Sequence, residues 1–542
     1  MEIKRLPLAL TAAFLAAQVL LSACAPCGPA GCAIDQAASS ASIPTTVPAA
    51  PPPPPVVGDG PWNLTLFHLN DTHTAFLPEP ATWRDDHALV GGVVAIQSYL
   101  AEQRAAAAPS LTFDAGDLMT GNPISEMEVN GVLGGAWIAM LNTLGIDAGV
   151  IGNHDFDQGR PNARALAAAS SWPMMALDLY DEHGKLEIPQ EPVVIERGGL
   201  RVGVIGVTCA GLFDVTADSR VAGLELVDQE PVVRRWIEEI DPETDLIVLI
   251  THNGIEGDLE LAEHLAGSGL DVIVGGHSHT RTREPRLVGG ILVVQAGGHV
   301  QNLGRLDLRV EDDRVVEYDG RLISLLAAGR TADAELTALA DRYAAEVDAE
   351  FGRVLATLST DWRRDSRGES NVGNWVCDRL MERAGADVAL LNSGTLRQNF
   401  TAGPVTKLQL NQLMPFGNLL EIFEVVGAEL ERICLVNARA AESGEHGILQ
   451  VGGLRYAYTV EGEDVRLLET SIGGQPIDPE HVYTVACPDY VAMKAELYMD
   501  MPVPPTRSTG VTITQALVEA VEAVGTANMT IDATTDGRIA RR

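Results

Sequence analysis

The sequence predicts an α/β protein of two domains joined by a long helix. Between residues 62 and about 325, short apolar runs bounded by Gly, Asn or Asp alternate with helical patterns, which is typical of an α/β domain. Residues 332–351 carry Ala, Glu, Leu and Arg in the pattern of one amphipathic helix. A second mixed α/β segment follows from about residue 355. A chain of 542 residues is too long for a single core, which agrees with this division.

Seven runs rich in Leu or β-branched residues are the predicted strands of the first domain. They are Leu64–Leu69, Ser110–Phe113, Ala148–Ile151, Leu200–Val207, Leu246–Ile250, Val272–Val274 and Ile291–Val294. Helices are predicted between several of them, for example at Ala136–Leu144 and Leu259–Ala266. The expected boundaries are 61–327 for this domain, 328–354 for the connecting helix and 355–542 for the second domain.

The first 60 residues predict export to the bacterial cell envelope. A basic start precedes an apolar run, Leu6–Leu21, so residues 1–23 are expected to be a signal peptide. The order Leu-Ser-Ala-Cys resembles a lipobox, which makes Cys24 the expected lipid attachment site in the periplasm or at the cell surface. A plain signal peptide and a signal-anchor helix are the alternatives. Residues 24–60 are expected to be an extended linker, because they are Ala- and Pro-rich and include Pro51–Pro55.

Charge and cysteine usage narrow the range of partners. The net charge of −36 repels nucleic acid, so a DNA or RNA polymer is not an expected partner. A small anionic substrate remains compatible if bound cations outweigh this charge locally. No cysteine spacing matches a zinc motif. The four scattered cysteines are expected to be isolated buried thiols: Cys209, Cys377, Cys434 and Cys487.

Five of the predicted strands run into clusters of polar residues. The clusters are Asn70–His73, Asp114–Asp117, Gly152–Asp157, Thr251–Gly254 and Gly275–His279. Ligands collect at the carboxyl ends of strands in α/β sheets, so these Asp, His and Asn side chains are expected to converge. Carboxylate, imidazole and amide donors suit divalent ions such as Zn, Mn or Co. Two such ions, about 3.5–4 Å apart, activate water and clamp a phosphoryl group.

The order of these clusters resembles the calcineurin-like metallophosphoesterase superfamily. The run Gly152-Asn153-His154-Asp155-Phe156-Asp157-x-Gly159 is similar to the motif of its 5′-nucleotidase branch, in which Glu is usual where Asp155 stands. The resemblance implies an N-terminal β-sandwich flanked by helices, in αββα order, and a C-terminal α/β nucleotide-binding domain.

The same resemblance implies roles for individual residues. One metal ion would be held by Asp71, His73, Asp117 and His279, and the other by Asp117, Asn153, His252 and His277. His154 would be catalytic and would stabilise charge on the phosphoryl group, oriented by Asp157. The remaining histidines have no matching context and are interpreted as structural or surface groups: His68, His87, His183, His299 and His446.

The second domain continues the resemblance, which therefore covers residues 62 to about 500. The segments Glu369–Asn374, Leu391–Arg397 and Pro415–Asn418 are similar to family motifs that grip a nucleotide. The implied substrate-binding residues are Arg367, Asn392, Arg397, Phe416 and Tyr490, with Arg363 an alternative to Arg367. The glycine run usual after the second aromatic ring is absent, and Glu496 stands roughly where the family has Asp.

Metal-dependent hydrolysis of nucleotide phosphate esters is therefore the expected activity. It covers nucleoside monophosphates and extends to di- and triphosphates or UDP-sugars. Three alternatives stay open. They are a 2′,3′-cyclic nucleotide phosphodiesterase, a thiosulfohydrolase of the sulfur-oxidation type, and a non-catalytic surface lipoprotein that binds a nucleotide.

Overall fold

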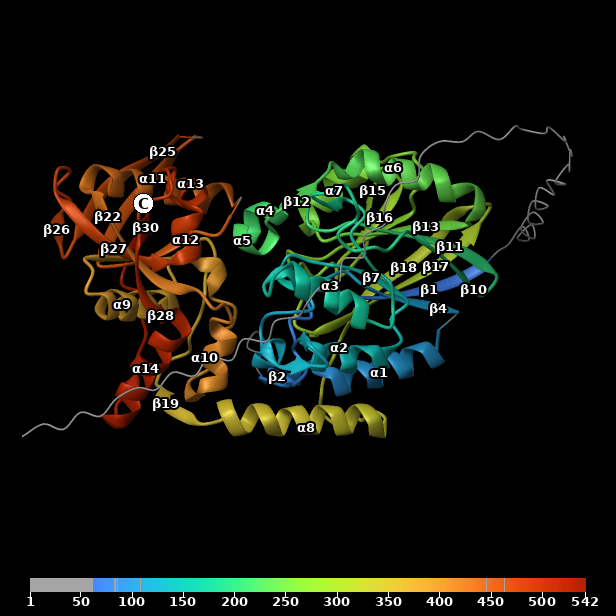
Figure 1. Ribbon diagram of the computed structural model, residues 1–542, viewed down its shortest axis with the longest axis horizontal. Helices are drawn as coiled ribbons and strands as arrows, with labels where there is room; N and C mark the ends of the chain where they lie inside the picture. The colour runs from blue at the N-terminus through green and yellow to red at the C-terminus, as the bar shows by residue number, and fades with distance from the viewer. Residues whose placement is uncertain (1–61, 82–83, 85, 108, 445, 463) are drawn as a thin grey trace, which may run out of the picture. The chain divides into compact units, whose positions relative to one another are not determined.

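The computed structural model describes residues 62–542 apart from 82, 83, 85, 108, 445 and 463 (Figure 1). The predicted signal peptide, the Pro/Ala-rich linker and Cys24 lie outside the described residues. Everything below concerns the described part of the chain.

Two six-stranded sheets build the first half of the described chain. The first sheet has the order β18-β17-β1-β4-β7-β8. Its strands are β1 (Trp62–Leu69), β4 (Ser110–Asp114), β7 (Ala148–Val150), β8 (Met174–Met175), β17 (Asn302–Glu311) and β18 (Arg314–Ser324). Strands β1, β4, β7 and β8 are parallel, so their carboxyl ends share one edge.

The second sheet has the order β10-β11-β13-β14-β16-β15. Its strands are β10 (Val193–Arg197), β11 (Leu200–Gly206), β13 (Leu246–Ile250), β14 (Val272–Val274), β15 (Arg286–Val288) and β16 (Ile291–Val294). Strands β11, β13, β14 and β16 are parallel. Apolar side chains from both sheets, such as Leu66, Phe113, Val204 and Val248, form one buried cluster between them.

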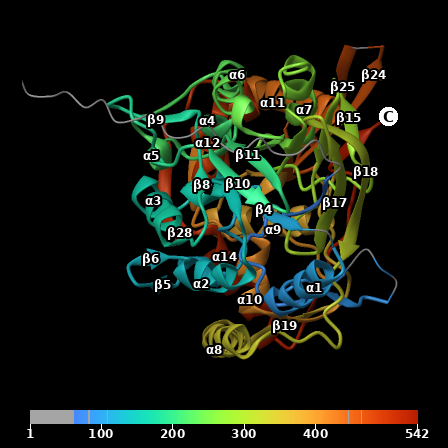
Figure 2. The same ribbon diagram turned by 90° about the vertical axis from the view of Figure 1, so that its right-hand side faces the viewer.

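Helices cover both outer faces of this sandwich (Figures 1 and 2). On the first sheet lie α1 (Val93–Ala105), α2 (Gly135–Leu141) and α3 (Arg160–Ala169), and on the second lie α6 (Gln229–Ile240) and α7 (Gly254–His264). Each helix layer shares a buried core with the outer face of its sheet. The αββα order is thereby confirmed, together with all seven predicted strands.

The predicted connecting helix is α8 (Ala334–Phe351). The Asp333 carboxylate accepts a hydrogen bond from the Leu336 N–H at 2.8 Å, which fixes the start of the helix. Leu336, Ala340, Tyr343 and Val347 are buried at helical spacing and join the same core as α1 and α2. The helix is therefore part of the helical layer on the first sheet.

The second half is a separate α/β assembly. Its central sheet has the order β23-β20-β27-β22-β28, with β20 (Val388–Asn392), β22 (Leu419–Val426), β23 (Leu449–Gly452), β27 (Val482–Pro488) and β28 (Arg507–Thr512). Smaller sheets comprise β19 (Val354–Leu358), β21 (Gly403–Thr406) and β29 (Thr530–Ile531), and β24 (Leu454–Glu461), β25 (Asp464–Ile472), β26 (Gln475–Pro476) and β30 (Ile539–Arg541). The main helices are α9 (Asn371–Ala384), α10 (Lys407–Leu413), α11 (Gly427–Ser443), α12 (Asp489–Met493), α13 (Ala495–Met499) and α14 (Ile513–Thr526).

The strand directions of this central sheet bring three of the predicted substrate residues to one edge. Strands β20 and β27 are parallel, so Asn392, the last residue of β20, and Tyr490, which follows β27, lie at the same ends of neighbouring strands. Strand β22 is antiparallel to β27, so Phe416, which precedes β22, lies at that edge too.

Candidate dinuclear metal centre

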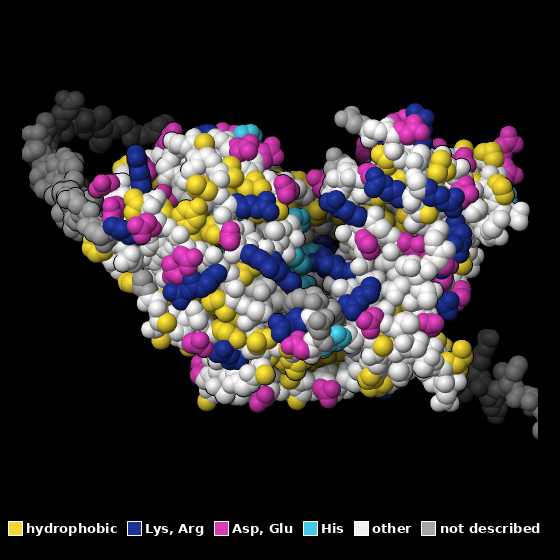
Figure 3. Space-filling view, turned by 180° about the vertical axis from the view of Figure 1, so that it is seen from behind, with side chains coloured by type: hydrophobic (Ala, Val, Ile, Leu, Met, Phe, Trp, Pro, Cys, Tyr) yellow, Lys and Arg dark blue, Asp and Glu magenta, His cyan; other side chains and the backbone are white. Residues whose placement is uncertain are grey.

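The five polar loops of the first half converge as predicted. Two groups of side chains each bring their donor atoms within 4.8 Å of one another. The first is Asp71, His73 and His279, and the second is Asp117, His252 and His277. Figure 3 shows histidines (cyan) in a hollow bordered by Lys and Arg (dark blue).

In the first group, three donor atoms face one point. His279 Nε2 lies 3.1 Å from His73 Nε2 and 3.3 Å from Asp71 Oδ1. His73 Nδ1 is 2.9 Å from the carbonyl oxygen of Met119, so it carries the proton and donates. This hydrogen bond leaves the lone pair on Nε2, which is the atom that faces Asp71 and His279.

The second group is organised in the same way. His252 Nδ1 donates to the carbonyl oxygen of Ala115 at 2.6 Å, and its Nε2 lies 3.1 Å from Asp117 Oδ2. His277 Nδ1 is 2.9 Å from Asn153 Oδ1, which adds the predicted amide donor to this group.

Asp117 stands between the two groups. Its Oδ1 accepts the N–H of His154 at 2.8 Å. Its Oδ2 lies 3.1 Å from His252 Nε2 and 3.9 Å from His73 Nε2, one histidine from each group. A single carboxylate oxygen therefore faces both groups, as a bridging ligand must.

The electrostatics of the centre call for bound positive charge. Asp71 and Asp117 are fully buried, and buried carboxylates are costly without a compensating cation. Burial lowers the pKa of His252, but the charge of Asp117 outweighs it and raises this pKa to about 10. His252 Nε2 is itself buried and makes no hydrogen bond within the described part of the chain. These donors fit two divalent cations.

The backbone of the centre is strained in a way that indicates function. Asp71, His73, Asp117, His277 and His279 all have φ between 47° and 75°, a region that costs non-glycine residues free energy. Strain of this kind persists where the surrounding fold over-determines a geometry. A Cβ on Gly152 would lie 2.2 Å from Asp117 Oδ1, so only glycine fits beneath this carboxylate.

His154 adjoins Asp117 of the centre and is paired with Asp157. Its Nδ1 is 2.9 Å from Asp157 Oδ2, which also accepts a hydrogen bond from the Thr120 hydroxyl at 2.6 Å. Burial lowers the pKa of His154, but the charges of Asp157 and Asp117 more than offset this, so the pKa is raised above its usual value. The imidazolium form of His154 is therefore favoured.

Two predicted substrate residues from the second half contact this centre. The Arg397 guanidinium lies 3.3 Å from His73 Nε2, and its charge centre is 5.9 Å from the Phe416 ring. The Phe416 ring lies 5.4 Å from that of His154.

Comparison with known proteins decides the family. Residues 64–281 match the calcineurin-like phosphoesterase family and residues 349–502 match the 5′-nucleotidase C-terminal domain family, and together these segments span more than half of the chain. The chain belongs to the 5′-nucleotidase family of calcineurin-like phosphoesterases. It is therefore a phosphoester hydrolase that works with two divalent metal ions.

Its relatives are distant. Protein UshA of Yersinia enterocolitica is 25% identical over 81% of this chain and 87% of its own length. The trifunctional nucleotide phosphoesterase protein YfkN of Bacillus subtilis is 26% identical over 81% of this chain. The matched region is only 32% of that longer protein. The 5′-nucleotidase precursor of Thermus thermophilus shares the fold, with a TM-score of 0.78 at 24% identity over 89% of this chain and 99% of that one.

Asp155, the departure from the usual motif of this 5′-nucleotidase family, has a structural role that the sequence did not reveal. Its buried carboxylate accepts the N–H groups of Asp117, Leu118, Met119 and Gly152 at 2.8–3.2 Å. The loops after β4 and β7 are thereby tied together beneath the metal centre.

The other predicted aromatic and amide residues, Tyr490 and Asn392, both contact Tyr498. The Tyr490 hydroxyl donates to the carbonyl oxygen of Asp214 at 3.1 Å, and the Tyr490 ring packs edge-on against Tyr498 at 6.2 Å. Burial raises the pKa of Tyr498, while hydrogen bonds with Asn392 and Tyr490 act in the opposite direction. Asn392, Tyr490 and Tyr498 therefore form one connected group.

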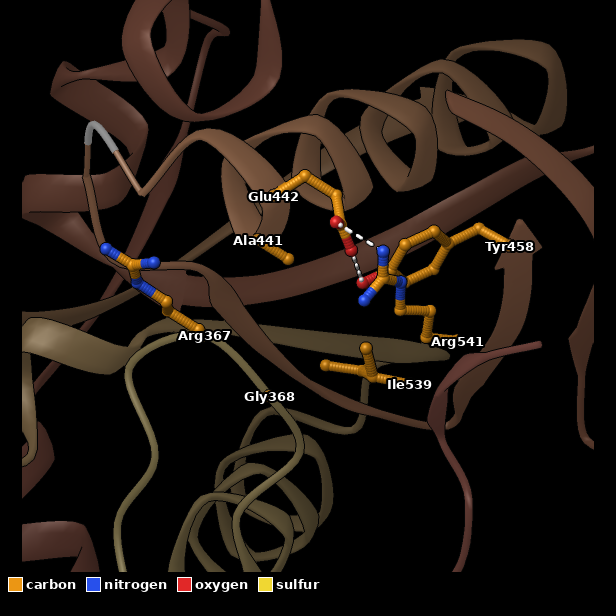
Figure 4. A pocket seen from close by; sticks show the side chains of 7 residues that line it. All are labelled: Arg367, Gly368, Ala441, Glu442, Tyr458, Ile539 and Arg541. Carbon is orange, nitrogen blue, oxygen red and sulfur yellow. Dashed lines mark hydrogen bonds and ion pairs between the residues drawn. The ribbon is translucent and has the colours of Figure 1, made fainter. Parts of the chain in front are cut away.

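Arg367 is not brought to this centre. It lines a cavity of about 380 Å³ with Gly368, Ala441, Glu442, Tyr458, Ile539 and Arg541 (Figure 4). There Arg541 and Tyr458 both contact the Glu442 carboxylate at 3.0 Å. Arg363 pairs with Asp361 at 2.7 Å. Arg364 Nη1 donates to the carbonyl oxygen of Leu396, the residue before Arg397, at 3.0 Å. Burial and the like charge of Arg397 lower the pKa of Arg364.

One histidine interpreted as structural or surface lies in the centre instead. The His299 ring is 5.2 Å from that of His73 and 5.4 Å from that of His279. The missed signal was the Gly297-Gly298-His299 run, which follows β16 as the other clusters follow their strands. His68, in contrast, is buried against Gly304 of β17.

The four scattered cysteines are free and buried, as predicted. Within the described residues, no helix combines the length and apolar character needed to cross a bilayer.

Proposed function

We propose that the protein hydrolyses the phosphate ester of nucleoside 5′-monophosphates, with di- and triphosphates and UDP-sugars as further substrates. One observation carries this proposal. A cation and an aromatic ring from the second half, Arg397 and Phe416, contact His73 and His154 of the metal centre. A phosphate at the metals would thus place the rest of its ester beside a guanidinium and a stacking surface.

The metal ligands follow the two groups and the shared carboxylate. We assign Asp71, His73 and His279 to one ion, Asn153, His252 and His277 to the other, and Asp117 to both. The bound ions would supply an activated water and charge compensation for the phosphoryl oxygens.

His154 and Asp157 are the proposed catalytic pair. Asp157 holds the imidazole by its Nδ1 and favours its charged form, so Nε2 is free to donate to a phosphoryl or leaving-group oxygen. The Phe416 ring lies 5.4 Å from this imidazole, tilted by 31° to it.

The substrate grip is proposed to comprise Arg397, Phe416, Tyr490 and Asn392. Arg364, near Arg397, supplies the second guanidinium in place of Arg367, which lines the separate cavity. We retain the domain boundaries 61–327, 328–354 and 355–542, although α8 packs with the helices of the first domain.

A substrate panel tests the activity. The purified chain should release phosphate from AMP and UMP with Zn, Mn or Co, and more slowly after metal removal by a chelator. Preference for 2′,3′-cyclic AMP would indicate a cyclic nucleotide phosphodiesterase instead. Preference for a thiosulfate conjugate would indicate a thiosulfohydrolase. Nucleotide binding without turnover under every metal would leave only a binding protein.

We further propose export and acylation at Cys24, which rests on the sequence before residue 25. A Cys24→Ser variant should pass from the membrane fraction to the soluble fraction of the cell envelope. An unchanged membrane fraction would contradict acylation at this residue.

A further inference from the structure

We propose that His299 is a positioning residue that holds the His73 and His279 imidazoles in place for one of the two metal ions. It deepens the proposed function and rests on the metal assignment given there. His299 belongs to neither group of candidate ligands. Its contacts, however, are to three members of the first group.

The main chain of His299 fixes the strand-end loop that carries Asp71. The His299 N–H donates to the Asp71 carbonyl oxygen at 2.7 Å. His299 itself has φ of 54°, so the chain is held in a conformation that few residues tolerate. The loop after β16 is thereby attached to the loop after β1, directly behind the ligand.

The ring of His299 fills the space beside both histidine ligands. It lies tilted by 37° against His73 and edge-on at 77° against His279. These spacings are within the range of aromatic packing. The preceding residue packs as closely, because a Cβ on Gly298 would lie 2.9 Å from His279 Nδ1.

His279 depends on this packing more than His73 and His252 do. His73 and His252 each have a backbone carbonyl that fixes their second nitrogen. Among the described residues, His279 Nδ1 has no such hydrogen bond, and its side chain is 23% exposed. The neighbouring ring of His299 restricts the rotation of this less constrained ligand. On its far side, His299 Nδ1 is 3.4 Å from the Gln398 amide nitrogen.

Two substitutions separate ring packing from backbone strain and from direct ligation. His299→Asn removes the ring but suits positive φ, whereas His299→Phe keeps a ring, cannot bind metal and suits positive φ less well. If packing matters, the Phe variant retains the metal and the Asn variant loses it, although the backbone cost has the opposite order.

The measurement is the metal content of the full chain after equilibration with buffered free Zn²⁺. Wild type and His299→Phe should hold two ions, and His299→Asn should require about tenfold or more free Zn²⁺ to fill the second. The exposed His183→Ala serves as the control and should match wild type. The metal content of the wild type tests the metal assignment by itself, because the assignment requires two ions. The variants then test the role of His299 separately.

Two results would overturn the role of His299. Wild-type affinity in His299→Asn would show that the ring is dispensable. Equal metal loss in Asn and Phe variants would show that a nitrogen of His299 is needed. Should circular dichroism show that the Asn variant is unfolded, Gly298→Ala supplies the test, because its Cβ displaces the same loop from His279 and should also weaken one ion.

Discussion

The metal centre and the proposed substrate grip are built on different principles. The centre draws its donors from the ends of parallel strands, where Asp117 or His252 has a fixed place set by the sheet. The grip uses side chains around one edge of the central sheet of the second half. Its residues Arg397 and Phe416 contact the metal centre. Few residue types bind a divalent ion, but many can hold a nucleotide, so only the first site is specified closely by residue identity.

The strongest test of this contrast is loss of the shared carboxylate. Asp117→Asn should lower turnover by more than about a hundredfold, because one oxygen faces both ligand groups. Metal content should fall below two ions per chain. Retention of both ions at wild-type affinity would show that Asp117 does not bridge.

The next test separates chemistry from metal binding. His154→Ala should reduce kcat by about 10²- to 10⁴-fold while both ions stay bound. Asp157→Asn should cause a smaller loss, because the imidazole remains but its charged form is less favoured. Phosphate release measured beside metal content gives both answers, and unchanged kcat in the Ala variant would remove His154 from the reaction.

A matched pair of arginines tests the grip. Arg397→Ala should lower kcat/KM for AMP by about 10- to 100-fold, since it removes a charged contact next to the centre. Arg367→Ala should change kcat/KM less than twofold, because Arg367 lines the cavity beside Glu442 and Tyr458. The reverse order of effects would restore Arg367 to the substrate site.

These comparisons also show how much of the fold and of the site could be predicted from the sequence. The strands and the convergence of Asp71, Asn153 and His277 were predictable, because strand ends and ligand chemistry constrain them together. The αββα order was predicted only through the family resemblance. The second arginine of the substrate grip could not be chosen from the sequence. Arg363, Arg364 and Arg367 lie within five positions, and only the fold separates them. His299 was missed because its run, Gly297-Gly298-His299, follows β16 as the other clusters follow their strands but matches no ligand motif, and its contact is packing between rings.

The smallest expected effect concerns a contact between the two halves. Glu79, in β2 (Glu79–Pro80), accepts hydrogen bonds from Gln412 Nε2 at 2.9 Å and Gln398 Nε2 at 3.3 Å, both from the second half. Burial raises the pKa of Glu79 from 4.5 to about 7, although the bond from Gln398 lowers it in part. The carboxyl group is therefore more readily protonated in the folded protein than in the unfolded chain.

The sign of the pH effect follows from this shift. Between pH 4.5 and about 7 the folded state binds more protons, so the free energy of unfolding falls as the pH rises through this window. Glu79→Gln should remove part of that fall, on the order of 1 kcal/mol given the partial exposure of the side chain.

The measurement is the change in thermal midpoint between the two ends of the window at saturating metal, with the exposed Glu196→Gln as control. Because metal loading affects wild type and variants alike, the difference between them isolates the carboxyl group. An identical pH profile in Glu79→Gln and wild type would mean that the two glutamine amides stabilise the ionised form fully, and that this contact between the halves is insensitive to pH.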